Sequence, residues 1–108
     1  MSGDAALSWW YRVLRGALDR QLPDLTTRQL ALLLHVSLQP GPHTVRGLAE
    51  TLSFSKPAVT RALDRLGRLG HVVRRRDPRD RRSVLVEVTE AGRAFLADLS
   101  RMVTAAAA

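Results

Sequence analysis

Residues 44–70 read TVRGLAETLSFSKPAVTRALDRLGRLG, and this stretch decides the fold. Its apolar side chains recur every three or four residues, which predicts amphipathic helices over 45–52 and 55–69. Only Ser53 and Phe54 separate the two helices. Two helices joined by so short a turn form a helix-turn-helix, in which the second helix can enter the major groove of DNA.

The sequence on either side predicts three more helices and a pair of strands. Helical periodicity places the helices over 5–21, 26–38 and 90–105. A valine-rich alternation with period two places strands over 71–75 and 83–89. The expected fold class is therefore mainly α with a small β-hairpin, a winged helix-turn-helix.

Polar side chains stand where four of these helices should begin. Thr44, Ser55 and Thr89 can each cap the helix that follows, because a side-chain oxygen accepts a free backbone N–H there. Thr26 and Gln29 fit a capping box, in which the two residues satisfy each other's backbone N–H groups. The start signals and the periodicity thus agree on the order of the elements.

The net charge of +7 is concentrated in one part of the chain. Residues 55–82 hold ten lysines and arginines and three aspartates, a net of +7, while the rest holds seven basic and seven acidic residues, a net of zero. Charge gathered in this way predicts a surface for a polyanion, most simply nucleic acid. A solvated basic face kept for solubility is the simpler alternative.

Composition argues against several other classes of protein. A chain without cysteine has no disulfide, thiolate nucleophile or thiol redox sensor. No apolar run reaches the ~20 residues that span a bilayer, and the N-terminus lacks the pattern of a signal peptide. His35, His43 and His71 are scattered, and no catalytic group, metal site or cofactor motif can be assembled. We expect a non-enzymatic cytoplasmic protein, associated with the nucleoid and not with a membrane.

The helix over 55–69 is the expected recognition helix. Its buried stripe leaves the opposite side and the first turns free to meet DNA. Arg61 is the favoured base reader, because a guanidinium can bond both acceptors of a guanine edge. The residues that we expect to contact DNA from this helix are Ser55, Lys56, Ala58, Thr60, Arg61 and Arg65.

The expected wing carries RRRDPRDRR, residues 74–82. A hairpin tip over 76–82, beside the recognition helix, would meet the minor groove, whose negative potential suits arginine. In an extended segment Asp80 and Arg82 can lie on one side and pair, which would orient the guanidinium before binding. Asp77 would help to form the turn before Pro78. We expect the remaining basic residues of the tip to face phosphates, namely Arg79 and Arg81.

Residues 48–93, LAETLSFSKPAVTRALDRLGRLGHVVRRRDPRDRRSVLVEVTEAGR, resemble the MarR family of bacterial and archaeal transcriptional regulators. The D-x-R-D-x-R wing, the valine-rich strand and T-E-A-G are the most specific part, and the similarity extends over about residues 7–100. The resemblance implies a dimeric winged helix-turn-helix regulator, usually a repressor, that binds pseudo-palindromic double-stranded DNA. By position, Arg82 matches the wing-tip arginine of the family and Asp80 the acid that holds it.

The chain length and hydrophobic content suit a single domain over residues 1–108. The resemblance also implies a homodimer, with 5–21 and 90–108 as dimerisation helices. Family members usually have a longer C-terminal part, in which two helical segments join the first helix to make the dimer. This chain holds roughly one of these segments and would form a smaller interface. The family's effector pocket lies beside those helices, which makes a small-molecule effector less secure here than DNA. The residues expected at the dimer interface are Trp9, Trp10, Val13, Phe95, Leu99 and Met102, although the tryptophans could instead complete the core of the monomer.

Two other classes of function stay open from the sequence. A winged helix can act as a protein-interaction module on a larger regulator, but such a module has no physical need for six arginines in nine residues. A nonspecific DNA-binding protein would use the same phosphates and would not need Arg61 to read bases. Selection of bound sequences separates both from a sequence-specific regulator.

Overall fold

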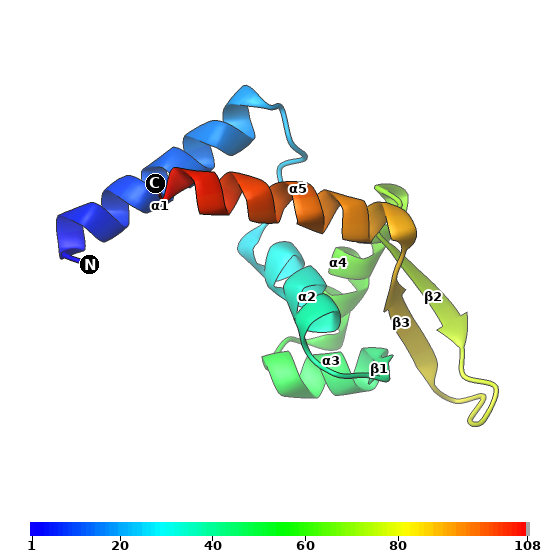
Figure 1. The fold of residues 1–108 in the computed structure, drawn as a ribbon. Coiled ribbons are helices and arrows are strands. Elements are labelled where there is room, and N and C mark those ends of the chain that lie inside the picture. The colour runs from blue at the N-terminus through cyan, green and yellow to red at the C-terminus, as the bar shows by residue number, and fades with distance from the viewer. Residues whose placement is uncertain (108) are drawn as a thin grey trace. The chain divides into compact units, whose positions relative to one another are not determined.

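The computed structural model describes residues 1–107. In chain order these residues form α1 (Gly3–Asp19), α2 (Thr27–Leu38), β1 (His43–Thr44), α3 (Val45–Leu52), α4 (Lys56–Arg68), β2 (Val72–Arg76), β3 (Val84–Val88) and α5 (Glu90–Ala106). All the predicted helices and both predicted strands are confirmed, with bounds within two residues of those expected. The winged helix-turn-helix fold class is therefore confirmed (Figure 1).

The chain divides into two compact units. One comprises residues 25–93, which hold the helix-turn-helix and the strands. The other combines residues 1–24 with the part of the chain from residue 94 onward. Each unit has its own packing and is described by itself.

The helices of the 25–93 unit begin where the sequence places their caps. Thr26 and Gln29 form the complete capping box, and the hydroxyls of Thr44 and Ser55 accept the backbone N–H groups of Gly47 and Ala58 at 2.9 and 3.2 Å. Ser53 adopts a left-handed backbone with φ 56°, which ends α3 and turns the chain into α4. These local bonds set where the helices of the helix-turn-helix begin and end.

The core of this unit lies between α2, α3, α4 and the sheet. The predicted inward stripe of α4 is buried at Val59, Ala62, Leu63 and Leu66. Leu32, Leu33 and Leu48 join it from α2 and α3 with no more than 1% of their surface exposed. Burial of these leucines and valines, each contributing about 1.5–3 kcal/mol, holds α4 in place and leaves its opposite side to solvent.

The sheet has three strands in the order β1-β3-β2, not the two-stranded hairpin that the sequence predicted. β1 pairs with β3 through His43 opposite Val86 and Thr44 opposite Leu85. A strand of two residues shows no alternation, so its pattern could not reveal it. The long hairpin of β2 and β3 extends beyond the helices of this unit (Figure 1).

A glycine corner joins the end of the hairpin to α5. The Thr89 hydroxyl accepts the Gly92 N–H at 2.9 Å, as expected for the cap of the last helix, and the Thr89 N–H donates to the His71 carbonyl. A Cβ at Gly92 would lie 2.2 Å from that carbonyl oxygen. Only glycine fits so close to a backbone, which explains why the T-E-A-G motif has a glycine at position 92.

In the other unit α1 packs against the C-terminal part of α5. The Trp9 indole N–H donates to the Val103 carbonyl at 3.3 Å, and the Arg12 guanidinium donates to the Ala106 carbonyl at 2.8 Å. A Cβ at Gly16 would meet the Met102 sulfur at 3.2 Å, so the two helices lie close together there. Within residues 1–107 no helix is long and apolar enough to cross a membrane.

Candidate nucleic-acid interface

The solvent side of α4 carries several of the expected contact residues. Lys56, Thr60 and Arg61 are exposed, while Ala58 and Arg65 are half-buried. Ser55 is exposed, and its hydroxyl is occupied by the cap of α4. Over residues 1–107 the side chains of Lys56 and Arg61 take part in no hydrogen bond or ion pair. Both are therefore free to meet an anion.

The wing loop, residues 77–83, is closed by bonds between its own residues. The Asp77 N–H donates to the Ser83 carbonyl at 2.9 Å, and the Ser83 N–H donates to the Asp80 carbonyl at 2.9 Å. The Asp77 carboxylate accepts the Arg79 N–H at 2.9 Å, which confirms its role in the turn at Pro78. The loop thus has a defined shape before any ligand arrives.

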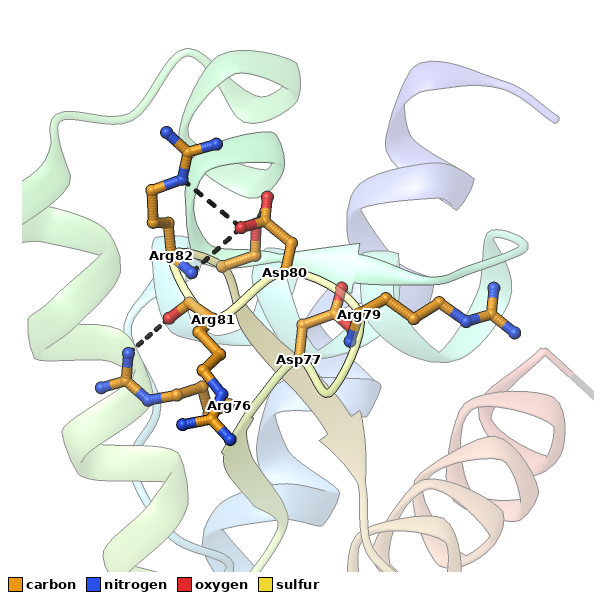
Figure 2. Close-up of polar contacts among 7 residues, drawn as sticks. Arg76, Asp77, Arg79, Asp80, Arg81 and Arg82 are labelled. Atoms are coloured by element: carbon orange, nitrogen blue, oxygen red, sulfur yellow. Dashed lines mark hydrogen bonds and ion pairs between the residues drawn. The ribbon is translucent and has the colours of Figure 1, made fainter.

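Asp80 and Arg82 pair as the sequence predicts, but in a different backbone. The Asp80 carboxylate lies 3.6 Å from the Arg82 Nε and accepts the Arg82 backbone N–H at 3.1 Å (Figure 2). The expected extended segment is wrong, because the bond from Ser83 to Asp80 makes this a tight turn. In this turn Asp80 bonds both the main chain and the guanidinium of Arg82. The Arg82 side chain remains 94% exposed.

The first three arginines of the motif bind other parts of the protein. Arg74 forms an ion pair of 2.8 Å with Asp64 of α4. Arg75 pairs with Glu87 across the sheet, and the Arg76 guanidinium donates to the Arg81 carbonyl (Figure 2). The bond from Arg75 lowers the pKa of the Glu87 carboxyl below its ordinary value of 4.5. The sequence analysis missed all three partners, because each joins residues whose proximity depends on the fold.

The acids of the basic stretch all have structural roles. Asp64 binds Arg74, Asp77 forms the turn, and Asp80 holds Arg82. Asp64 and Asp80 form ion pairs with arginines, so they do not oppose the basic surface as free charges would, whereas Asp77 bonds only the backbone N–H of Arg79. In the described chain the side chains of Arg79 and Arg81 have no partner, and in Figure 2 the Arg79 and Arg82 side chains point away from each other.

A family model described as MarR family matches residues 24–83, more than half of the chain. The chain belongs to the MarR family. The matched residues run from just before α2 to the end of the wing loop, so they include both α4 and the wing described above.

Known relatives of this MarR-family chain agree with the assignment. It is 36% identical over 63 residues to an uncharacterized HTH-type transcriptional regulator, YcgE, of Bacillus subtilis (strain 168). That match covers 58% of this chain and 41% of the relative, so the chain matches about two fifths of that protein.

Two solved structures of similar fold contain DNA. The transcriptional repressor CouR bound to a 23-mer DNA duplex is 32% identical, with a TM-score of 0.72 over 94% of this chain and 68% of that one. A mutant MarR from E. coli complexed with operator DNA is 34% identical, with a TM-score of 0.70 over 85% of this chain and 64% of that one.

The residues expected at the dimer interface differ in their exposure. Val13 and Met102 are buried in this MarR-family chain. Trp9, Phe95 and Leu99 are half-buried, and Trp10 is 47% exposed. The exposed apolar side chains of α1 lie at intervals of three and four residues, and all but Trp10 were not on the expected list; they are Leu7, Trp10, Tyr11, Leu14 and Leu18.

The three histidines of this MarR-family chain all lie in the 25–93 unit. The rings of His35 and His43 pack edge to face with centroids 5.3 Å apart. His71 is buried, and the loss of solvent lowers its pKa below 6.5. Among residues 1–107 no group of three potential ligands could hold a metal ion.

Proposed function

We propose that the protein binds double-stranded DNA sequence-specifically, with α4 in the major groove and the wing loop in the adjacent minor groove. The observation that carries the proposal is Arg82. It stands almost fully exposed at a hairpin tip and is held there by Asp80. A guanidinium oriented in advance loses less side-chain entropy on insertion into a narrow groove. The two DNA-bound structures of similar fold support binding to DNA.

α4 supplies the base readout in this proposal. Arg61 is exposed and free, and it can bond the O6 and N7 of guanine together. Lys56 and Thr60 meet phosphates or base edges from the first turns. Ser55 contributes through the helix start, since its hydroxyl already caps the helix. Arg79 and Arg81 meet the phosphates that flank the wing.

We further propose that the protein acts as a homodimer on a pseudo-palindromic site and represses transcription. Leu7, Trp10, Leu14 and Leu18 form an exposed apolar stripe along α1. Large apolar side chains repeated along one helix face favour burial against a partner. A two-fold dimer places two α4 helices about one helical turn of DNA apart, which requires a site with the same symmetry.

The first test is selection of bound sequences from a random duplex pool, followed by titration of the enriched site over a salt series. We expect a palindromic motif with half-sites ~34 Å apart. The Arg61→Ala variant should lose about 1–3 kcal/mol on that motif and discriminate less at one base position.

Other outcomes of the selection would overturn the proposal in different ways. Binding without an enriched motif, lost at moderate salt, identifies a nonspecific DNA-binding protein. No binding at low salt identifies a protein-interaction module. A motif without two-fold symmetry removes the homodimer and keeps sequence-specific binding.

A further inference from the structure

Asp64 is an acid on the solvent side of a helix that otherwise presents cations there. Lys56, Arg61, Arg65 and Arg68 all belong to the same helix, and a free carboxylate among them would repel the phosphates of DNA. In the structure Asp64 is not free, because its carboxylate lies 2.8 Å from the Arg74 guanidinium.

The Asp64–Arg74 pair joins the two elements that are proposed to enter the two grooves. Asp64 lies in the second half of α4, and Arg74 is the middle residue of β2, the strand that leads into the wing loop. The pair spans a hollow lined by both elements, including Gly67, Val72 and Val73. Inside the hairpin, Arg75 and Arg76 bind Glu87 and the Arg81 carbonyl, so their guanidinium groups make no bond to α4.

We propose that the Asp64–Arg74 ion pair sets the angle of the wing relative to α4, and that Asp64 is thereby a positioning residue that determines specificity. This inference rests on the proposed function for its DNA part alone. When the ion pair is formed, the distance between the wing tip and α4 is fixed. The protein then favours DNA in which the minor-groove segment stands at one distance from the base contacts of α4.

The size of the effect follows from the exposure of the pair. The two side chains are 39% and 43% exposed, and an exposed ion pair stabilises a fold only slightly. Its loss therefore leaves the protein folded and changes the preference between DNA spacings by about two- to fivefold. A positioning residue changes the spacing preference without unfolding the protein, whereas a residue needed for stability would lower the stability of the fold.

The orientation can be measured without DNA. The chain contains no cysteine, so spin labels at Gly67→Cys in α4 and Arg79→Cys in the wing loop report one distance. Labelled protein is diluted with unlabelled protein to suppress distances between subunits. We expect a narrow distribution for the native pair and a broader or shifted one for Asp64→Asn. The reversed pair, Asp64→Arg with Arg74→Glu, should restore the narrow distribution. Equal distributions in all three proteins overturn the proposal.

Binding to a duplex series provides the second measurement. The series separates the major-groove motif from an A/T-rich flank by one additional or one missing base pair. Asp64→Asn removes one negative charge and should bind nonspecific duplex at least as tightly, yet it should distinguish the spacings two- to fivefold less. The reversed pair and Asp64→Glu should recover the preference. Equal changes on all duplexes mean that Asp64 acts only through its charge, which overturns the inference.

A matched control separates charge from position. Glu50→Gln makes the same charge change on α3, in the same unit, where Glu50 is exposed and has no ion pair in the described residues. It should shift affinity for all spacings together and leave the label distances unchanged. If the native protein selects no site at all, the proposed function has failed, while the label distances still decide whether the pair sets the wing.

Discussion

The six arginines of residues 74–82 fall into two groups of three, one on β2 and one in the wing loop, and the two groups make different contacts. Arg74, Arg75 and Arg76 lie on β2 and bind a carboxylate of α4, a carboxylate of β3 and a carbonyl of the wing loop. The loop arginines stand in solvent, and the one with a partner, Arg82, is oriented by it and not covered. A dense run of like charge in a sequence therefore overstates the charge that the surface offers to a ligand, because part of it is used to hold the structure.

The largest expected effect belongs to the loop group. Arg82→Ala should weaken binding to the selected site by about 1–3 kcal/mol and relax the preference for a narrow, A/T-rich flank. Titration against duplexes with A/T-rich and G/C-rich flanks measures both changes. Uniform loss on every flank would instead make Arg82 an ordinary phosphate contact.

Asp80→Ala should follow, with a smaller loss of affinity than Arg82→Ala. The substitution removes a negative charge and so favours DNA electrostatically, but it also releases the Arg82 guanidinium and main chain. The salt series from the first test applies to this variant as well. Tighter binding at every salt concentration would show that the orientation of Arg82 has no value for binding.

Arg79→Ala and Arg75→Ala test the comparison directly, since they change charge equally. Arg79 has no partner in the described chain, so its removal should weaken binding uniformly and reduce the salt slope by about one. Arg75 is engaged with Glu87, so its removal should leave affinity within about twofold and the slope unchanged. Similar salt slopes for the two variants would show that the β2 arginines and the loop arginines contribute equally to DNA binding.

The smallest expected effect concerns stability and pH. The pKa of Glu87 is lowered by Arg75, so the ionised carboxylate favours the folded state. That contribution is present above the ordinary pKa of 4.5 and is lost as the pH falls through the lowered value. Thermal melts of Glu87→Gln at several pH values should show a small deficit at neutral pH that closes in acid. A deficit that persists in acid would point to a cause other than the ion pair.

Local signals allowed most of the fold to be predicted. The Thr26 capping box, the Ser55 cap and the Thr89 cap act within a single turn, so their residues identify them in the sequence. β1 was missed because two residues carry no period. The end of α1 was placed too late, because the chain already adopts a left-handed backbone at Gln21, before Pro23.

The candidate site could be predicted only in part. Asp80 and Arg82 are two residues apart, so their pairing was accessible from the sequence, although the backbone between them was not. Arg74 and Asp64 meet only after β2 folds back along α4, and no local sequence pattern predicts that contact. For α1 the periodicity revealed apolar faces, but packing decided that Val13 is buried and that Trp10 is exposed.

The conformation of the wing loop is determined by contacts among very few residues. The bonds that close it run between Arg76 and Ser83, and the ion pair that orients Arg82 lies inside the same segment. We expect these eight residues, placed between the paired strands of an unrelated hairpin, to keep their arginine geometry. If the wing enters the minor groove as proposed, the segment would give protein engineers a compact minor-groove probe.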